Sequence, residues 1–102
     1  MKNFLPVDPL IENTHWLAIH HPQPDYPLHI LILSKQGIAA IEDVPGDNLD
    51  LNKDFLKIIT SLIIQFDLNN RGYRLIINGG PNQLVPLLHW HLVSDQGSDS
   101  RA

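Results

Sequence analysis

Two histidines in the last apolar segment of the chain lie two residues apart, with a tryptophan between them. Residues i and i+2 of a strand point to the same face, so the imidazoles of His89 and His91 lie side by side and Trp90 points to the opposite face. Such a pair serves as a hydrogen-bonded polar cluster, as a divalent metal site, or in nucleophilic and acid–base catalysis. The spacing alone leaves all three interpretations open.

A third histidine, His29, lies in a separate apolar segment and joins the pair if the two segments are neighbouring strands. The metal interpretation then has three imidazole ligands, His29, His89 and His91. The chain has six histidines and no cysteine. The lack of cysteine excludes a disulfide framework and a thiolate metal site, and it favours a cytoplasmic protein.

Composition limits the function classes that these histidines can serve. With seven basic and eleven acidic residues, the 102-residue chain has a formal net charge of −4, which argues against a nucleic-acid polymer as partner. No apolar stretch approaches the roughly 20 residues of a membrane span. Pro6, Asp8 and Pro9 interrupt the first apolar run, unlike a signal peptide. We therefore expect one cytoplasmic domain without a membrane partner.

Four short apolar runs predict the strands that must position the histidines. They are too short for helices of their own and rich in β-branched residues and leucine, which is typical of buried strands. Three prolines between the first two runs exclude a helix interior there. The predicted strands are His15–His20, Leu28–Ser34, Tyr73–Ile77 and Leu87–Val93, with a turn at Asn78–Asn82.

One longer segment predicts a helix. Between Leu51 and Phe66, apolar residues recur at intervals of three and four, which is the spacing of one helix face. Ile64 lies off this stripe, so we expect it to be exposed or to contact another subunit. The candidate caps are Asp47, Asn48 and Asp50 at the start and Asn69–Gly72 at the end.

The order strand, strand, helix, strand, strand predicts an α+β domain, with a mostly antiparallel sheet and one main helix on a face. We expect the domain to span residues 1–94 and the polar residues 95–102 to form a flexible C-terminal tail. Trp16 and Trp90 are expected in the core or at a dimer interface, and His15 and His20 in solvent.

Several segments in a fixed order give a more specific signal than the histidine pair. The last strand is preceded by Gln83 and Val85 and contains Leu87, His89 and His91. Upstream, residues 17–35 combine an acidic residue, prolines and a histidine before an apolar run that ends near a lysine, and residues 73–79 end in Asn-Gly. From about residue 17 to residue 93 the chain resembles the histidine triad (HIT) superfamily of nucleotide hydrolases and transferases, whose last strand carries Gln-x-Val-x-His-x-His-x-His.

The resemblance implies a role for each matching residue. His89 matches the histidine that attacks the α-phosphorus of a nucleoside phosphate and forms a phosphohistidine, which water then resolves. His91 matches the histidine beside the leaving group, and the backbone carbonyl of Leu87 is implied to hold the second nitrogen of His89. Asn78 and Gln83 match polar contacts to ribose or phosphate. The resemblance implies no metal and no cofactor.

The chain also departs from the family pattern. Leu87 stands where the first histidine belongs, so we expect His29, a supporting residue of the site, to lose its histidine partner. Leu84 replaces a serine that contacts phosphate, and His21 replaces the acidic residue that binds the ribose hydroxyls. A histidine at position 21 is expected to stack on a base or to bind a different phosphate.

The resemblance therefore implies a HIT-like nucleotide-binding protein. Its activity would be that of a nucleoside-phosphate hydrolase or nucleotidyl transferase, acting on phosphoramidates or dinucleoside polyphosphates. The departures leave an alternative, a catalytically degenerate HIT-like module that binds a nucleotide or small phosphate ligand without turnover. The family also implies a homodimer whose sheets join across a two-fold axis, with Ile64 and Trp90 as candidate contacts.

Overall fold

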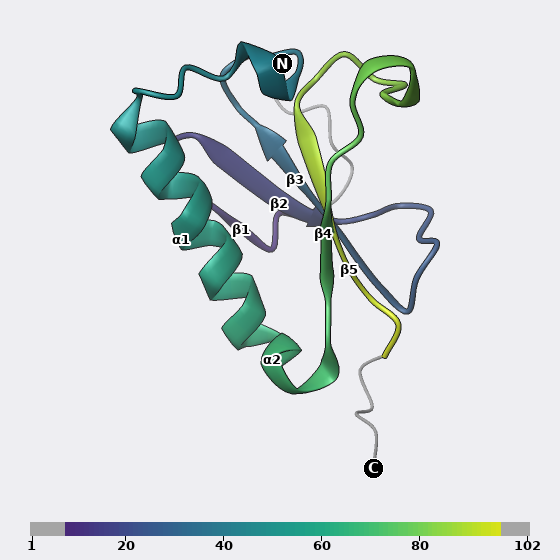
Figure 1. The fold of residues 1–102 in the computed structure, drawn as a ribbon. Coiled ribbons are helices and arrows are strands. Elements are labelled where there is room, and N and C mark those ends of the chain that lie inside the picture. The colour runs from purple at the N-terminus through teal and green to yellow at the C-terminus, as the bar shows by residue number, and fades with distance from the viewer. Residues whose placement is uncertain (1–7, 97–102) are drawn as a thin grey trace.

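A five-stranded sheet with one long helix on one face makes up the fold (Figure 1). The computed structural model describes residues 8–96. All neighbouring strands are antiparallel, in the spatial order β1-β2-β3-β5-β4. The elements are β1 (Ile11–Glu12), β2 (Trp16–His20), β3 (Leu28–Ser34), α1 (Leu49–Gln65), α2 (Leu68–Arg71), β4 (Arg74–Ile76) and β5 (His89–Ser94), with 3₁₀ turns at Ile41–Asp43 and Gly80–Asn82. The predicted α+β class is confirmed.

The register of the central strands decides which side chains share the face away from α1. Strand β5 lies between β3 and β4, with His89 opposite Leu33 and His91 opposite Leu31. His29 is opposite Val93, which lies two residues beyond His91 and points to the same face. The sheet therefore brings His29 to the same surface as the histidine pair of β5.

Helix α1 covers the other face of the sheet (Figure 1). Its apolar stripe packs on inward-pointing side chains of β2, β3 and β5, and the indole Nε1–H of Trp16 donates to the Leu51 carbonyl at 2.9 Å. This bond satisfies a buried donor where β2 meets the helix. The main buried core residues are Trp16, Ala18, Leu28, Ile30, Ile32, Leu51, Ile58, Ile59, Leu62, Leu68, Leu88 and Leu92.

The helix boundaries refine the predicted caps. Asn48 begins α1, because its side-chain oxygen accepts from the Leu51 N–H at 3.0 Å. The stop predicted at Asn69–Gly72 lies instead at the end of the short helix α2. Asp67 has a φ of 56°, and this left-handed residue separates α1 from α2. Gly72 ends α2 with a φ of 83°, a conformation that glycine adopts without a Cβ penalty.

Two histidines outside the site differ in their surroundings. His15, expected in solvent, bonds through Nδ1 to Asp54 Oδ2 at 2.7 Å, and its side chain is only 17% exposed. That prediction was wrong because the partner is supplied by α1, 39 positions away. His20 is exposed, and its ring meets Phe66 edge-on at 6.0 Å.

The strand predicted at Leu87–Val93 begins later, at His89. The N–H of Leu87 turns back to the carbonyl of Val85 at 2.8 Å, so the segment before β5 is a turn. The tail predicted at residues 95–102 lies outside the described residues from position 97 onward. Between residues 8 and 96, neither helix has the length and apolar character needed to cross a bilayer.

Candidate active site

Four imidazoles gather where β2, β3 and β5 meet, and we call them the histidine cluster: His21, His29, His89 and His91. The ring centroids of His21 and His29 are 4.3 Å apart, those of His29 and His91 5.1 Å, and those of His89 and His91 5.2 Å. His21 directly follows β2, and its N–H donates to the His29 carbonyl at 2.8 Å. The predicted pair in β5 is therefore part of a larger group.

The position of the proton on His89 follows from one short hydrogen bond. Its Nδ1 lies 2.7 Å from the carbonyl oxygen of Leu87, and a carbonyl only accepts, so Nδ1 carries the proton. In the neutral ring the lone pair is then on Nε2. His89 is half-buried and lines a pocket of about 270 Å³. This is the arrangement that the resemblance implied for the Leu87 carbonyl.

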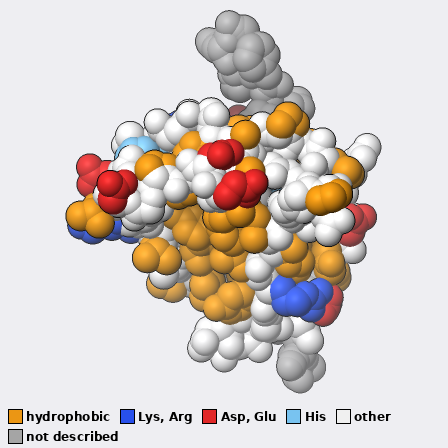
Figure 2. Space-filling model, turned by 45° about the horizontal axis from the view of Figure 1, so that its top comes forward, with side chains coloured by type: hydrophobic (Ala, Val, Ile, Leu, Met, Phe, Trp, Pro, Cys, Tyr) orange, Lys and Arg blue, Asp and Glu red, His pale blue; other side chains and the backbone are white. Residues whose placement is uncertain are grey.

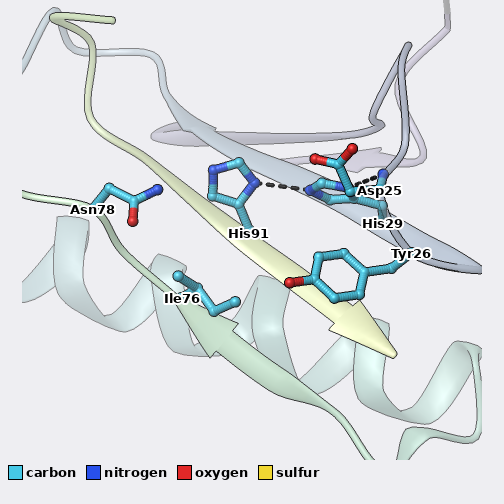
Figure 3. A pocket seen from close by; sticks show the side chains of 6 residues that line it. All are labelled: Asp25, Tyr26, His29, Ile76, Asn78 and His91. Atoms are coloured by element: carbon cyan, nitrogen blue, oxygen red, sulfur yellow. Dashed lines mark hydrogen bonds between the residues drawn. The ribbon is translucent and has the colours of Figure 1, made fainter. Parts of the chain in front are cut away.

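A second chain of hydrogen bonds fixes the protons of His29 and His91 (Figure 3). The backbone N–H of Asp25 donates to His29 Nδ1 at 3.1 Å, so the proton of neutral His29 lies on Nε2. That nitrogen is 2.9 Å from His91 Nδ1 and donates to it. His91 consequently carries its own proton on Nε2. The expectation that His29 has no histidine partner was wrong, because His91 takes that place.

Burial favours the neutral form of both His29 and His91. Desolvation lowers the pKa of His29, and His21 lowers it further, with Asp25 acting in the opposite direction. The pKa of His91 is lowered by desolvation and then by the imidazoles of His89, His29 and His21, again opposed by Asp25. The cluster therefore presents a lone pair on His89 Nε2 beside an N–H donor on His91 Nε2.

Asn78 and Gln83, the predicted polar contacts, lie in different surroundings. The side-chain Nε2 of Gln83 donates to the carbonyls of Ala39 at 2.6 Å and Val85 at 3.0 Å. Both amide hydrogens thus hold the loop before β5, and only the amide oxygen is left for a ligand. Asn78 is exposed and lines two pockets that both include His91, and Figure 3 shows the one that also contains His29.

Two further walls of the site were not predicted from the sequence. The ring of Tyr26 meets His29 edge-on at 5.3 Å, and the guanidinium of Arg74 lies over the Tyr26 ring at 5.5 Å. On the other side, Leu31, Leu33, Val85 and Leu87 form an apolar wall against His21 and His89. The histidine cluster therefore borders an apolar pocket and a more polar one.

The metal interpretation can be tested on the donor atoms. His21, His29 and His91 each place one nitrogen within 4.8 Å of the others, a different trio from the predicted one. The Nδ1 of His21 accepts from the Gln23 N–H at 3.0 Å, and the Nδ1 of His29 accepts from Asp25. Both rings therefore carry their proton on Nε2, which leaves no lone pair on that nitrogen for a metal. The hydrogen bonds favour a polar or catalytic cluster over a metal site.

Two curated relatives cover most of this chain. The HIT-like protein of Chlamydia pneumoniae is 37% identical over 86 residues, which are 82% of this chain and 77% of the relative. The adenosine 5′-monophosphoramidase of Candida albicans is 30% identical over 101 residues, covering 91% of this chain and 64% of that protein.

Solved structures share the fold. A HIT family hydrolase from Legionella pneumophila superimposes with a TM-score of 0.80 at 32% identity, covering 90% of this chain and 84% of the other. The histidine triad nucleotide-binding protein of Candida albicans gives a TM-score of 0.74 at 27% identity, over 86% and 65% of the two chains. The HIT domain family matches residues 5–98. Together with the histidine cluster, these findings show that the chain belongs to the HIT domain family.

Proposed function

We propose that this protein binds a nucleoside phosphate and hydrolyses it, or transfers its nucleotidyl group, through a phosphohistidine on His89. One observation carries the proposal: the 2.7 Å bond from His89 Nδ1 to the Leu87 carbonyl leaves a lone pair on Nε2 in the pocket. Residue 87 contributes only its backbone carbonyl to this bond, so the bond does not require a histidine at that position. The names of the Legionella and Candida relatives support hydrolysis and nucleotide binding as the class of activity.

The first step forms a bond between His89 Nε2 and phosphorus while the bond from phosphorus to the leaving group breaks. His89 then carries a positive charge, which the Leu87 carbonyl stabilises through Nδ1–H. His91 donates a hydrogen bond from its Nε2–H to the leaving atom, where negative charge develops. The leaving group takes up a proton from water.

The second step returns the protein to its starting state. Water attacks phosphorus, the bond to His89 Nε2 breaks, and one proton of the water is released to solvent. The sum is hydrolysis of one phosphoramidate or phosphoanhydride bond by one water molecule. His29 does not touch the substrate in this scheme; it is a positioning residue that sets the proton of His91.

The experiment uses a purine nucleoside phosphoramidate and a dinucleoside polyphosphate, with release of the leaving group followed by chromatography. Mass spectrometry after brief mixing detects the adduct on His89. We expect turnover and adduct in the wild type and neither in His89→Asn. An absence of turnover, while another family member hydrolyses the same substrates alongside, contradicts the proposal. Tight binding of AMP in that case identifies the degenerate module.

We also propose that two copies associate through an apolar surface. Figure 2 shows hydrophobic side chains gathering on one face of the molecule. On α1, Leu56 is 62% exposed and Ile64 is 79% exposed. Trp90 is half-buried and packs on Phe55 of α1, with ring centroids 4.9 Å apart. Light scattering coupled to size exclusion tests the proposal: the wild type elutes as a dimer and Ile64→Glu as a monomer.

A further inference from the structure

We infer that His21 makes the pocket prefer ligands with a second phosphoryl group beside the one that reacts at His89, an inference that rests on the proposed function. The ligand class is a nucleotide with two phosphoryl groups, carried either as a 5′-diphosphate or with one of them on the sugar.

The ring of His21 is held by two contacts, and its backbone is held by a third. Its backbone N–H continues the β2–β3 ladder to the His29 carbonyl at 2.8 Å. Its face lies against the His29 ring, with centroids 4.3 Å apart and planes inclined by 34°. Its Nδ1 accepts from the Gln23 N–H at 3.0 Å. The ring therefore has a set position before any ligand binds.

These contacts also set the hydrogen-bonding character of His21. Because Nδ1 accepts, the neutral ring has its proton on Nε2 and presents a donor. His21 is thus a fixed N–H donor, and it offers no acceptor to a ligand hydroxyl.

A second fixed donor lies nearby in the same pocket. His91 carries its proton on Nε2, and the ring centroids of His21 and His91 are 6.1 Å apart with planes inclined by 22°. The side chains lining this pocket include no carboxylate among the described residues. Asp25 lines the neighbouring pocket, which shares Asn78 and His91 with this one. Two donors in a pocket whose own lining has no carboxylate suit an anionic ligand.

The choice between a phosphoryl group and a sugar diol follows from these donors. Hydrogen bonds to an ionised oxygen are about twice as strong as those between neutral groups. A sugar diol is bound most firmly by a carboxylate, which accepts from both hydroxyls, and His21 accepts from neither. With His91 committed to the reacting group, the donor of His21 is left for a second phosphoryl oxygen.

Isothermal titration calorimetry with AMP, ADP and adenosine 3′,5′-bisphosphate tests this inference. We expect the wild type to bind one of the two doubly phosphorylated ligands at least about tenfold more tightly than AMP. ADP as the tighter ligand places the second group on the phosphate chain, and the bisphosphate places it on the sugar. Equal binding of all three ligands overturns the inference.

Substitutions at position 21 separate the donor from the ring. His21→Phe keeps the ring against His29 without the N–H, and His21→Asp offers an acceptor; both are expected to lose the preference, and His21→Asp to reverse it. His20→Gln, on the exposed neighbour, is the matched control and keeps it. A preference that survives in both position-21 variants overturns the inference.

The outcomes distinguish this inference from the proposed function. Turnover with a phosphohistidine but without the preference removes the role of His21 alone. The preference without turnover in the wild type removes the chemistry at His89 and leaves the binding role. No binding of any of the three nucleotides contradicts both.

Discussion

The two sides of the pocket are held in place by different means. On the β5 side, His89 is fixed by a carbonyl only two residues earlier in the chain. On the β2–β3 side, His21 and His29 depend on cross-strand pairing and on backbone N–H groups of the proline-rich connection. The position of the proposed nucleophile therefore does not depend on the side chain at position 87. The proposed binding side depends more on single side chains, such as the histidine at position 21.

The largest effect is expected when the nucleophile itself is removed. His89→Asn deletes the ring nitrogen proposed to bond to phosphorus, and loss of a covalent nucleophile typically lowers kcat by roughly a thousandfold or more. Steady-state kinetics on a nucleoside phosphoramidate measure this loss. A variant within tenfold of wild-type kcat would remove His89 from the mechanism.

A smaller loss is expected on the opposite side of the pocket. His29→Leu removes the donor to His91 Nδ1, which frees His91 to adopt the other tautomer. Substitution of such a positioning partner typically lowers activity by about 10–100-fold. His29→Gln, whose amide can donate to His91, should retain more activity than the leucine variant. The pH profile of kcat should also shift in His29→Leu. The imidazole of His29 lowers the pKa of His91, so the pKa of His91 rises when that imidazole is removed.

Position 87 allows a separate test of how His89 is held, because a substitution there changes the side chain and keeps the backbone carbonyl. Leu87→Ala keeps the carbonyl that accepts from His89, so we expect kcat to fall by less than about tenfold. Melting temperature, measured in parallel, reports the cost of trimming the half-buried side chain. A loss in kcat as large as that of His89→Asn would show that the leucine side chain, and not the backbone, positions the nucleophile.

The smallest effect is expected in the pH dependence of stability. Burial lowers the folded-state pKa of His29 and His91 below the ordinary value of 6.5. The unfolded chain therefore takes up protons first, and the free energy of unfolding falls as the pH drops through 6.5 and on toward the folded-state pKa values. Urea unfolding at pH 7.5 and 5.5 measures the change. His29→Leu should show a smaller decrease than the wild type, and an equal decrease would contradict this assignment.

Features that depend on neighbours in sequence were predicted from the sequence. Apolar periodicity predicted α1, alternation placed His89 and His91 on one face, and the Leu87 carbonyl lies within two residues of its partner. The longer strands of the sheet were predicted because each lies in a short, mostly apolar run. Among the strands of residues 8–96, β1 has two residues and a single apolar side chain and gave no such signal.

Features that depend on register or on loop conformation were not predicted. The bond between His29 and His91 joins residues 62 positions apart, and that between His15 and Asp54 joins residues 39 apart. The donor to His29 is the backbone of Asp25, so residue type carries no signal for it. Burial of a polar side chain together with a partner is decided by the sheet, whereas composition and spacing report only that the side chain is polar.

The pairing of β3 with β5 also has a consequence for the order in which the site forms. The bond between His29 and His91 closes a loop of 62 residues that contains both helices. The chain entropy lost on closing this loop costs a free energy of roughly 3–4 kcal/mol plus a constant. Contacts of this range form after local helical ones. The proton arrangement of His91 is therefore acquired only when the central strands have joined, and its NMR signature would mark complete folding rather than early collapse.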